Sequence, residues 1–556
     1  MADTEGTRSL PQPEGWSWRD RAKGSILSGV VLNPDVEPVD GIEVFPTAYV
    51  PHRLLVSGMR PDGENDRALL ARNIDRIAQA AAAFGWGVAR ELLDGTEIGE
   101  DVELPEPRVP GAPAIVRVRL TTPDEPDRGI SPALPDAWRV LQRVRRDALA
   151  GEAVRGKLGA VDAAAVLRKA GIDRIGLDHI VAIDPIGLNP FTQTNPFTQT
   201  NPFTQTNPVA EYIHSGRGGR QPVAWVGAAP LRTPVPYGSR RAVVAILDTG
   251  AGTHPWLPAD VVDRDVTIDG RPVGLTGVAN PEVYPDLYGP LDGEIDPVAG
   301  HGTFIAGIVR QAAPDADLLA IRVADGLGIV DESALLQVIE DLAVLVFRFR
   351  SGRSDGRPID VLSLSLSYYH ETPRDGLYSR DLYDLLTALR YLGTVVVASA
   401  GNDAIDRPTF PASLWAWQGS ENGIVPDDYS AHLSVGALNP SGRATALFSN
   451  VGPWVRTYAI GAGVVSTLPD FLGGIQATAR DDQYGRVRRT IDPDDYRGGF
   501  AVWSGTSFAA PLVAGRVAAL LRPAAEGEKE AAAEAATAAD AVAKVLAQGE
   551  VASGGD

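Results

Sequence analysis

The sequence predicts an α/β protein in which a parallel sheet is flanked by helices and preceded by a small α+β domain. Two observations predict this fold class. From about 222 to 521, short apolar runs alternate with helical patterns rich in small residues, as in a parallel sheet covered on both faces. From 46 to 188, strand and helix patterns alternate over a shorter length. A chain of 556 residues, 44% hydrophobic and 22% charged, is long enough for two or three domains.

The N-terminal part divides into a lead-in and the α+β domain. Residues 1–45 are rich in proline, glycine and acidic side chains and show little periodicity, so we expect a flexible lead-in. The domain over 46–188 is predicted from its apolar stripes and apolar runs. Its expected strands are 53–57, 88–93, 114–120 and 179–183, and its expected helices are 65–84, 137–158 and 163–170.

A perfect six-residue repeat follows this domain. Three copies of Asn-Pro-Phe-Thr-Gln-Thr fill 189–206. Proline at every sixth position is incompatible with a helix or a central strand, and six residues are too few to bury a core. We therefore expect an extended linker over 189–221. The alternative is an array of phenylalanine-bearing docking or cleavage sites.

Continuous apolar runs and a helical tail complete the predicted architecture. The runs are typical of strands buried on both faces of a sheet. The tail over 522–556 is rich in alanine and glutamate, which favours a helix that is solvated or bound to a partner. The expected buried strands are 242–247, 317–323, 361–366 and 395–400.

Charge and cysteine content exclude several classes of function. The chain has 51 Lys and Arg against 71 Asp and Glu, a net charge of −20, which argues against binding nucleic acid or an anionic membrane. It has no cysteine, so thiol catalysis, disulfides and thiolate metal sites are excluded. We see no signal peptide and no apolar run near the ~20 residues of a membrane-spanning helix. The expected location is therefore cytoplasmic.

Three separated segments carry the residue types of nucleophilic catalysis. Asp248 ends a predicted buried strand in Asp-Thr-Gly, where catalytic groups gather in open α/β sheets. His301 opens a predicted helix in Gly-His-Gly-Thr, and Ser507 enters another in Gly-Thr-Ser-Phe-Ala-Ala-Pro. Taken singly, such segments are commonly turns, satisfied core histidines and helix caps. An acid, a base and a serine within one predicted domain together indicate an active site.

These segments resemble the catalytic blocks of the subtilisin-like (subtilase) serine peptidases, over about 222–521. The resemblance implies a subtilisin-like parallel sheet and a serine endopeptidase whose triad follows the chain order acid, base, serine. Asp248 would orient His301, which would take the proton of Ser507 during attack on the substrate carbonyl. The substrate would be a protein or a peptide, and this chemistry requires no cofactor.

The resemblance also implies donors for the oxyanion that forms during attack. The Ala-Gly-Asn sequence at 400–402 follows a predicted strand and is similar to the family's oxyanion block, so Asn402 is the expected side-chain donor. The amide of Ser507 at a helix start is the expected second donor. The alternative role for Asn402 is that of an ordinary turn residue.

Two segments resemble the family's substrate-binding edges. The Ser-Leu-Ser sequence at 365–367 is similar to the wall of the specificity pocket, and the glycine-containing segment 324–328 is similar to the edge that pairs with extended substrate. Where the family has Ser-Leu-Gly this chain has a third side chain, which puts broad specificity in doubt. The expected substrate-binding residues are Gly326, Gly328, Ser365, Leu366, Ser367, Ala400 and Gly401.

The segment between Asp248 and His301 is longer than a compact member of the family needs. It includes Asp292, Glu294 and Asp296, which could ligate calcium together with backbone carbonyls. Their spacing does not match an EF-hand loop, so a solvated acidic loop is the favoured alternative. We assign no metal-binding residue.

The N-terminal domain resembles the propeptide of secreted subtilases, with the sequence from Asp178 to Val181 similar to the way such propeptides end. The long helix expected over 137–158 is not part of that resemblance. A propeptide-like domain would assist folding or block the active site, and an activating or regulatory protein partner is a further expectation. Two alternatives to the peptidase stay open: a catalytically silent binding scaffold on the same fold, and a serine esterase, whose Gly-x-Ser-x-Gly motif is not matched here.

Overall fold

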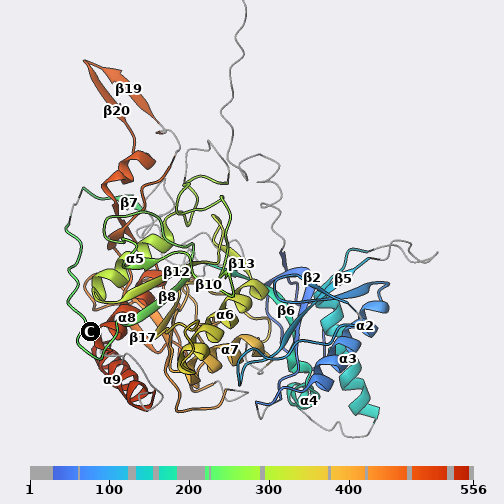
Figure 1. Cartoon of the computed structure of the whole chain (residues 1–556). Helices are drawn as coiled ribbons and strands as arrows, with labels where there is room; N and C mark the ends of the chain where they lie inside the picture. Colours follow the sequence, from blue (N-terminus) through green and yellow to red (C-terminus); the bar gives the residue numbers. More distant parts are fainter. Residues whose placement is uncertain are drawn as a thin grey trace, which may run out of the picture.

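The structure is a computed structural model that describes residues 29–60, 63–99, 101–122, 133–154, 162–183, 220–224, 227–288, 295–373, 377–419, 424–472, 477, 479–521 and 531–549. Two large sheets organise it, one in the N-terminal domain, drawn in blue and cyan, and one in the larger domain, drawn from green to red (Figure 1). All three hexads of the expected linker lie outside the described residues.

The N-terminal domain is an antiparallel sheet with helices packed on it. The strand order is β4-β3-β5-β2-β6, and β1 pairs with β2. Leu54 and Val118 from the sheet and Ile77 and Leu141 from the helices are fully buried in one apolar core. Each strand and helix expected in this domain has a counterpart. The strands are β1 (Val30–Val31), β2 (Ala48–Ser57), β3 (Gly87–Glu91), β4 (Glu97–Ile98), β5 (Ile115–Thr121) and β6 (Ile175–Ala182), and the helices are α2 (Arg67–Ala82), α3 (Ala137–Val154), α4 (Ala163–Lys169) and η1 (Ile172–Arg174).

Residues 29–45 belong to this domain, so the expectation of a flexible lead-in over 1–45 is wrong for this stretch. Leu32, Val39 and Ile42 are buried in the domain core. Their spacing is irregular and gives no helix or strand period, which is why composition alone suggested a loose segment. Residues 1–28 lie outside the described residues.

The larger domain is built on a parallel sheet of order β17-β16-β15-β14-β8-β12-β9. The four expected buried strands are β8, β12, β14 and β15, and every residue of β8 is buried, as its continuous apolar sequence predicts. The strands are β8 (Val243–Asp248), β9 (Val262–Asp263), β12 (Asp317–Arg322), β14 (Val361–Leu364), β15 (Val395–Ser399), β16 (His432–Leu438) and β17 (Thr457–Ile460).

Helices cover both faces of the parallel sheet (Figure 1). The helices α5 (His301–Ala312) and α8 (Thr506–Leu520) share one apolar core with the sheet, and α6 (Glu332–Arg350) and α7 (Arg380–Tyr391) share the core on the other face. A Cβ at Gly515 of α8 would lie 2.6 Å from the Cβ of Ala312. Glycine at this position therefore allows α5 and α8 to approach closely.

Smaller antiparallel sheets also form part of the larger domain. The antiparallel hairpin β19–β20 extends away from the body of the molecule (Figure 1). A second hairpin is β10–β11, and a three-stranded sheet has the order β18-β21-β7. These strands are β7 (Gln221–Pro222), β10 (Thr267–Ile268), β11 (Arg271–Pro272), β18 (Val464–Thr467), β19 (Arg480–Gln483), β20 (Arg486–Arg489) and β21 (Phe500–Trp503), with the turn η4 (Pro493–Gly498) before β21.

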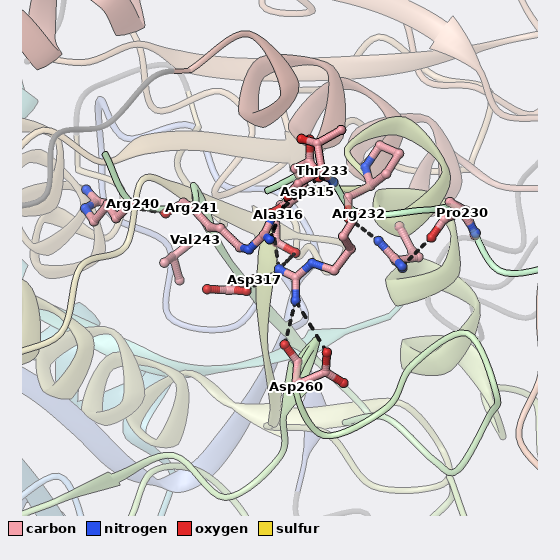
Figure 2. A network of polar contacts seen from close by, with 12 residues as sticks. Pro230, Arg232, Thr233, Arg240, Arg241, Val243, Asp260, Asp315, Ala316 and Asp317 are labelled. Atoms are coloured by element: carbon pink, nitrogen blue, oxygen red, sulfur yellow. Dashed lines mark hydrogen bonds and ion pairs between the residues drawn. The ribbon is translucent and has the colours of Figure 1, made fainter. Parts of the chain in front are cut away.

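A polar network fixes the chain that leads into β8 (Figure 2). Arg232 donates to the carboxylate of Asp317 and, at 2.6 Å, to the backbone oxygen of Asp260. Arg241 donates to the backbone oxygen of Asp315 at 3.1 Å, and Thr233 donates to the carboxylate of the same residue. The network ties the incoming chain to the start of β12, next to β8 in the sheet.

The C-terminal helix α9 (Ala531–Gly549) packs on the larger domain. Ala541, Val542 and Val545 are buried in the same core as α8. The helix expected in the tail is therefore present, but it is neither solvated nor separate, and the expected domain boundary at 521 is wrong. Its apolar residues are mostly alanine and form only a weakly amphipathic pattern, so this packing could not be predicted from the sequence.

The two domains share a sheet edge. The strand β13 (Ile329–Asp331) of the larger domain pairs antiparallel with β6, the last strand of the N-terminal domain. The N-terminal sheet therefore continues into the larger domain. None of the helices in the described ranges combines the length and the apolar character needed to cross a bilayer.

Candidate active site

Asp248 and His301 meet at the carboxyl end of β8. Asp248 is the last residue of β8 and His301 is the first residue of α5. The Nδ1 atom of His301 lies 2.8 Å from Oδ1 of Asp248, and both side chains are buried. A Cβ at Gly302 would lie 2.0 Å from the carbonyl oxygen of Gly250, so the glycine after the histidine is needed for this approach. The two motifs are therefore joined through their backbones as well.

Ser507 is the second residue of α8 and precedes Phe508, whose ring contacts the imidazole of His301. The ring of His301 contacts residues on both sides of the serine, with ring centroids 5.3 Å from Trp503 and 5.2 Å from Phe508. The backbone oxygen of Ser507 accepts a hydrogen bond of 2.9 Å from Oγ of Ser365. The structure thus brings the expected acid, base and serine to one place and links the serine to the expected specificity segment.

Asn402 is held next to Ser507 by its amide oxygen. Oδ1 of Asn402 accepts from the backbone N–H of Thr506 at 2.8 Å and from its hydroxyl at 2.9 Å. The same hydroxyl is 3.1 Å from the amide of Gly401, whose φ of 97° favours glycine. Because two donors identify Oδ1 as the oxygen, the orientation of the Asn402 amide is fixed by this network.

Glu282 is a buried carboxylate beneath the pair of Asp248 and His301, and sequence reasoning missed it. It accepts hydrogen bonds from the hydroxyl of Thr249 and from the backbone N–H of Gly302 at 3.0 Å. It also accepts from the hydroxyl of Thr303 and, at 3.2 Å, from its backbone N–H. Glu282 therefore ties the residue after the acid to the first turn of the helix that begins with the base.

The surroundings of Glu282 shift the pKa of its carboxyl in both directions. Burial raises the pKa of its carboxyl, and the nearby charge of Asp248 acts in the same direction, while hydrogen bonds from Thr249 and Thr303 lower it. The hydroxyl of Thr249 also lies 3.1 Å from Oδ1 of Asp248, so it contacts both carboxylates. The two threonines need an acceptor once they are buried, but nothing in the sequence singles out Glu282 as that acceptor.

The expected substrate-binding segments flank the end of the N-terminal domain. Ala182 donates to the backbone oxygen of Ser367 at 2.9 Å and accepts from its N–H at 2.8 Å. On the other side, Ile183 donates to the backbone oxygen of Gly328 at 2.8 Å. An extended strand of this chain therefore lies between the two expected edges.

The other expected substrate-binding residues have different surroundings. Leu366 is buried in the core, and a Cβ at Gly326 would meet the carboxylate of Asp296 at 2.7 Å. The backbone oxygen of Ala400 accepts from Thr409 and Asn450 at 3.0 Å each. These contacts hold the backbone of the two segments in place, and they do not turn these residues toward a substrate.

Two groups of residues bear on metal binding. Asp296 accepts backbone hydrogen bonds on both carboxylate oxygens, at 2.8 Å from Leu287 and 3.2 Å from Tyr288, while the other two carboxylates of the calcium hypothesis, Asp292 and Glu294, lie outside the described residues. His179, His370 and Glu371 place ligand atoms within 4.8 Å of one another. Both ring nitrogens of His179 already face carboxylates, so His179 has no free nitrogen for a metal, whereas Nε2 of His370 and Oε1 of Glu371 are buried without a hydrogen-bond partner among the described residues.

Comparison with known proteins agrees with this geometry. The model of the subtilase family matches residues 239–550, which is more than half of the chain. The chain belongs to the subtilase family. The match extends through α9, in agreement with the packing of that helix.

Several curated proteins each match about half of the chain. The Thermophilic serine proteinase of Bacillus sp. (strain AK1) is 28% identical over 52% of this chain and 53% of its own length. Mycosin-4 of Mycobacterium tuberculosis is 29% identical over 50% of this chain and 55% of its own length. Serine protease AprX of Bacillus subtilis is 26% identical over 50% and 56%. The chain thus spans about half the length of these relatives.

Proposed function

We propose that the chain is a serine endopeptidase that cleaves protein or peptide substrates through Asp248, His301 and Ser507. The observation that carries the proposal is the 2.8 Å contact of His301 with Asp248, made beside the first turn of the Ser507 helix. Membership of the subtilase family and the similarity to serine proteinases support it.

The mechanism follows from this arrangement. Asp248 bonds Nδ1 of His301, so Nε2 is the nitrogen that accepts a proton. Oγ of Ser507 attacks the carbonyl carbon of the scissile bond, and its proton passes to Nε2. The tetrahedral intermediate collapses when His301 gives this proton to the leaving amine. Water then hydrolyses the acyl-enzyme with the same base.

The oxyanion of the tetrahedral intermediate needs donors that are already in place. The amide of Asn402 is oriented by the two hydrogen bonds from Thr506, and the backbone N–H of Ser507 lies at the start of α8. We assign both as oxyanion donors, because groups fixed before the reaction stabilise developing charge without reorganisation.

The N-terminal domain is proposed to inhibit the peptidase. A substrate bound as an added strand would need the backbone groups of Gly328 and Ser367, and Ile183 and Ala182 already use them. The strand is antiparallel to the segment that reaches Ser365, whose hydroxyl bonds the backbone of Ser507. Activation then requires that this strand leave, either after cleavage of the segment that contains the hexads or through a regulatory partner.

Labelling with a serine-directed fluorophosphonate tests the peptidase. We expect label on the wild-type chain and none on Ser507→Ala, with the site confirmed by mass spectrometry of the labelled peptide. A chain that folds but is not labelled, even after its N-terminal domain has been removed, would favour the binding scaffold instead. A labelled enzyme that hydrolyses esters but no peptide would contradict the endopeptidase.

A further inference from the structure

The segment of β6 between the two expected substrate edges ends at a pair of buried glutamates. The first expected edge, 324–328, continues to residue 332, and the second, 365–367, continues to residue 371; these longer stretches are called the edge segments. Ala182 of β6 and Ile183 just beyond it bond the edge segments through the backbone, and Val181 and Ile180 pair with β13. The next residue, His179, places its side chain between the far ends of both segments.

His179 contacts one glutamate from each segment. Its Nδ1 lies 2.6 Å from Oε2 of Glu332 and its Nε2 lies 2.8 Å from Oε2 of Glu371. The imidazole is stacked on the ring of Tyr368, with centroids 4.7 Å apart and planes inclined at 26°. All four side chains are buried. A planar cation of the N-terminal domain is thus enclosed by two carboxylates and an aromatic ring of the catalytic domain.

The catalytic domain itself holds Glu332 in place. Oε1 of Glu332 accepts from the hydroxyl of Ser379 and, at 3.2 Å, from the hydroxyl of Tyr368. Neither donor belongs to the N-terminal domain, so this orientation does not depend on His179. Glu371 lies four residues after Ser367 along the second edge segment, which continues from the end of β14.

The charges show what this glutamate pair is suited to bind. Burial alone would lower the pKa of His179, but Glu332 and Glu371 raise it to about 10. His370 of the catalytic domain has Nδ1 3.4 Å from Oε2 of Glu371, but burial lowers the pKa of His370 to about 3, so it supplies no charge. The other cation near the pair, Arg145, lies 3.6 Å from Oε1 of Glu371 and also belongs to the N-terminal domain. When that domain leaves, both cations leave with it. Two carboxylates that face each other across one buried site are costly without a counter-charge.

We propose that Glu332 and Glu371 form a subsite for a cationic side chain of the substrate, which His179 occupies in the inhibited chain. This inference rests on the proposed peptidase function. Arginine fits best, because its planar guanidinium can stack on Tyr368 and donate to both carboxylates. The natural substrates are then proteins that carry an arginine at one fixed position upstream of the cleaved bond.

The strand register sets that position. Ala182 pairs with Ser367, and an antiparallel partner continues by two residues to the position opposite Ser365, next to Ser507. His179 lies three residues before Ala182. We therefore expect the arginine about five residues upstream of the residue that stands opposite Ser365.

An arginine scan tests the subsite. Neutral, extended peptides of identical sequence with one cleavable bond carry a single arginine at successive upstream positions. Cleavage by the full-length chain is measured per active site, as titrated with fluorophosphonate. We expect kcat/KM to rise about tenfold for one position of the scan. Glu332→Gln and Glu371→Gln, which keep the side-chain shape, should each remove this preference while cleavage of the neutral peptide continues.

Glu340→Gln is the matched control. Glu340 also lies on α6 and pairs with Arg108 of the N-terminal domain at 3.0 Å, so its substitution weakens the domain contact without touching the pair. This variant should keep the arginine preference. A flat scan, or a preference that survives in both Gln variants, would overturn the subsite and leave the peptidase intact. Absence of both labelling and cleavage would overturn the peptidase and the subsite together.

Discussion

Two buried histidines, one at the proposed catalytic centre and one between the domains, differ in the number of carboxylates they face. His301 faces one carboxylate, that of Asp248, and both come from motifs of the same domain. His179 faces two, Glu332 and Glu371, and reaches them from another domain. One carboxylate orients a base that must return its proton. Two carboxylates hold the proton of His179 instead. The site between the domains is therefore suited to binding the two domains together and not to proton transfer.

The largest effect on activity is expected at the pair of Asp248 and His301. Asp248→Asn keeps the shape of the side chain but no longer stabilises the tautomer and the charge that His301 needs. We expect kcat to fall by about 10⁴-fold, with a much smaller change in KM. The measurement is steady-state hydrolysis of a peptide by the purified variant. A decrease of less than tenfold would mean that this histidine does not depend on its carboxylate.

The next largest effect on activity is expected for the proposed oxyanion donor, Asn402. Asn402→Ala removes an amide that Thr506 holds in place, and kcat should fall by about 10²- to 10³-fold. Asn450→Ala serves as a comparison, because Asn450 is also a buried asparagine that bonds the backbone of Ala400 but does not contact Thr506 in the described structure. Reduced stability with little change in kcat is expected for Asn450→Ala. Equal effects on kcat would contradict the role given to Asn402.

Glu282 should show an intermediate effect on catalysis. Glu282→Gln keeps one acceptor oxygen near Thr249 or Thr303, replaces the other by an amide NH2 group, and removes an ionisable carboxyl close to Asp248. As a positioning residue it should alter kcat by about tenfold, leave KM nearly unchanged and shift the pH profile of kcat/KM. A purely structural role would instead lower the melting temperature and leave the pH profile of the folded enzyme where it was.

The site between the domains should respond to pH. The docked His179 keeps its proton up to a pKa of about 10, whereas an exposed histidine loses it near pH 6.5. Between these values the docked state binds one more proton, so docking weakens as pH rises. Amide exchange of β6 in the full-length Ser507→Ala chain, corrected for intrinsic rates, should show protection that falls from pH 6.5 to 10.

Substitution of the histidine should flatten this dependence. His179→Gln retains a polar side chain but cannot carry the charge, so protection of β6 should be lower at pH 6.5 and should vary less with pH. His52→Gln is the control, because His52 lies on β2 of the same domain and burial lowers its pKa. Unchanged pH dependence in His179→Gln would show that another group controls docking.

Sequence reasoning could single out the residues of the proposed catalytic centre but not the contact between the domains, for a physical reason. Asp248, His301, Asn402 and Ser507 each stand in a short motif whose glycines and small residues are needed for close approach, so the signal is local. His179 lies 153 and 192 positions from its two partners, and nothing near it in the chain indicates either. The strand β13 has only three residues and follows the glycine-containing edge. Its pairing with β6 could therefore not be predicted from the sequence either.

The sequence also could not show which individual carboxylates are buried. Glu282 was one of many acidic residues in the long segment before His301, and only the fold shows that it faces four donors from two motifs. The packing of residues 29–45 and of α9 was missed because both have irregular apolar patterns whose partners are distant in the chain.

The rate of fluorophosphonate labelling at Ser507 in the full-length chain tests the inhibited state most directly. Ala182→Pro removes the N–H that bonds Ser367, at a position beyond the pairing of β6 with β2, and Ala182→Ser keeps that N–H as a control. If β6 blocks the active site, Ala182→Pro should label at least about tenfold faster than wild type and Ala182→Ser should not. Equal rates in all three folded proteins would contradict the proposal that the N-terminal domain inhibits a Ser507 peptidase.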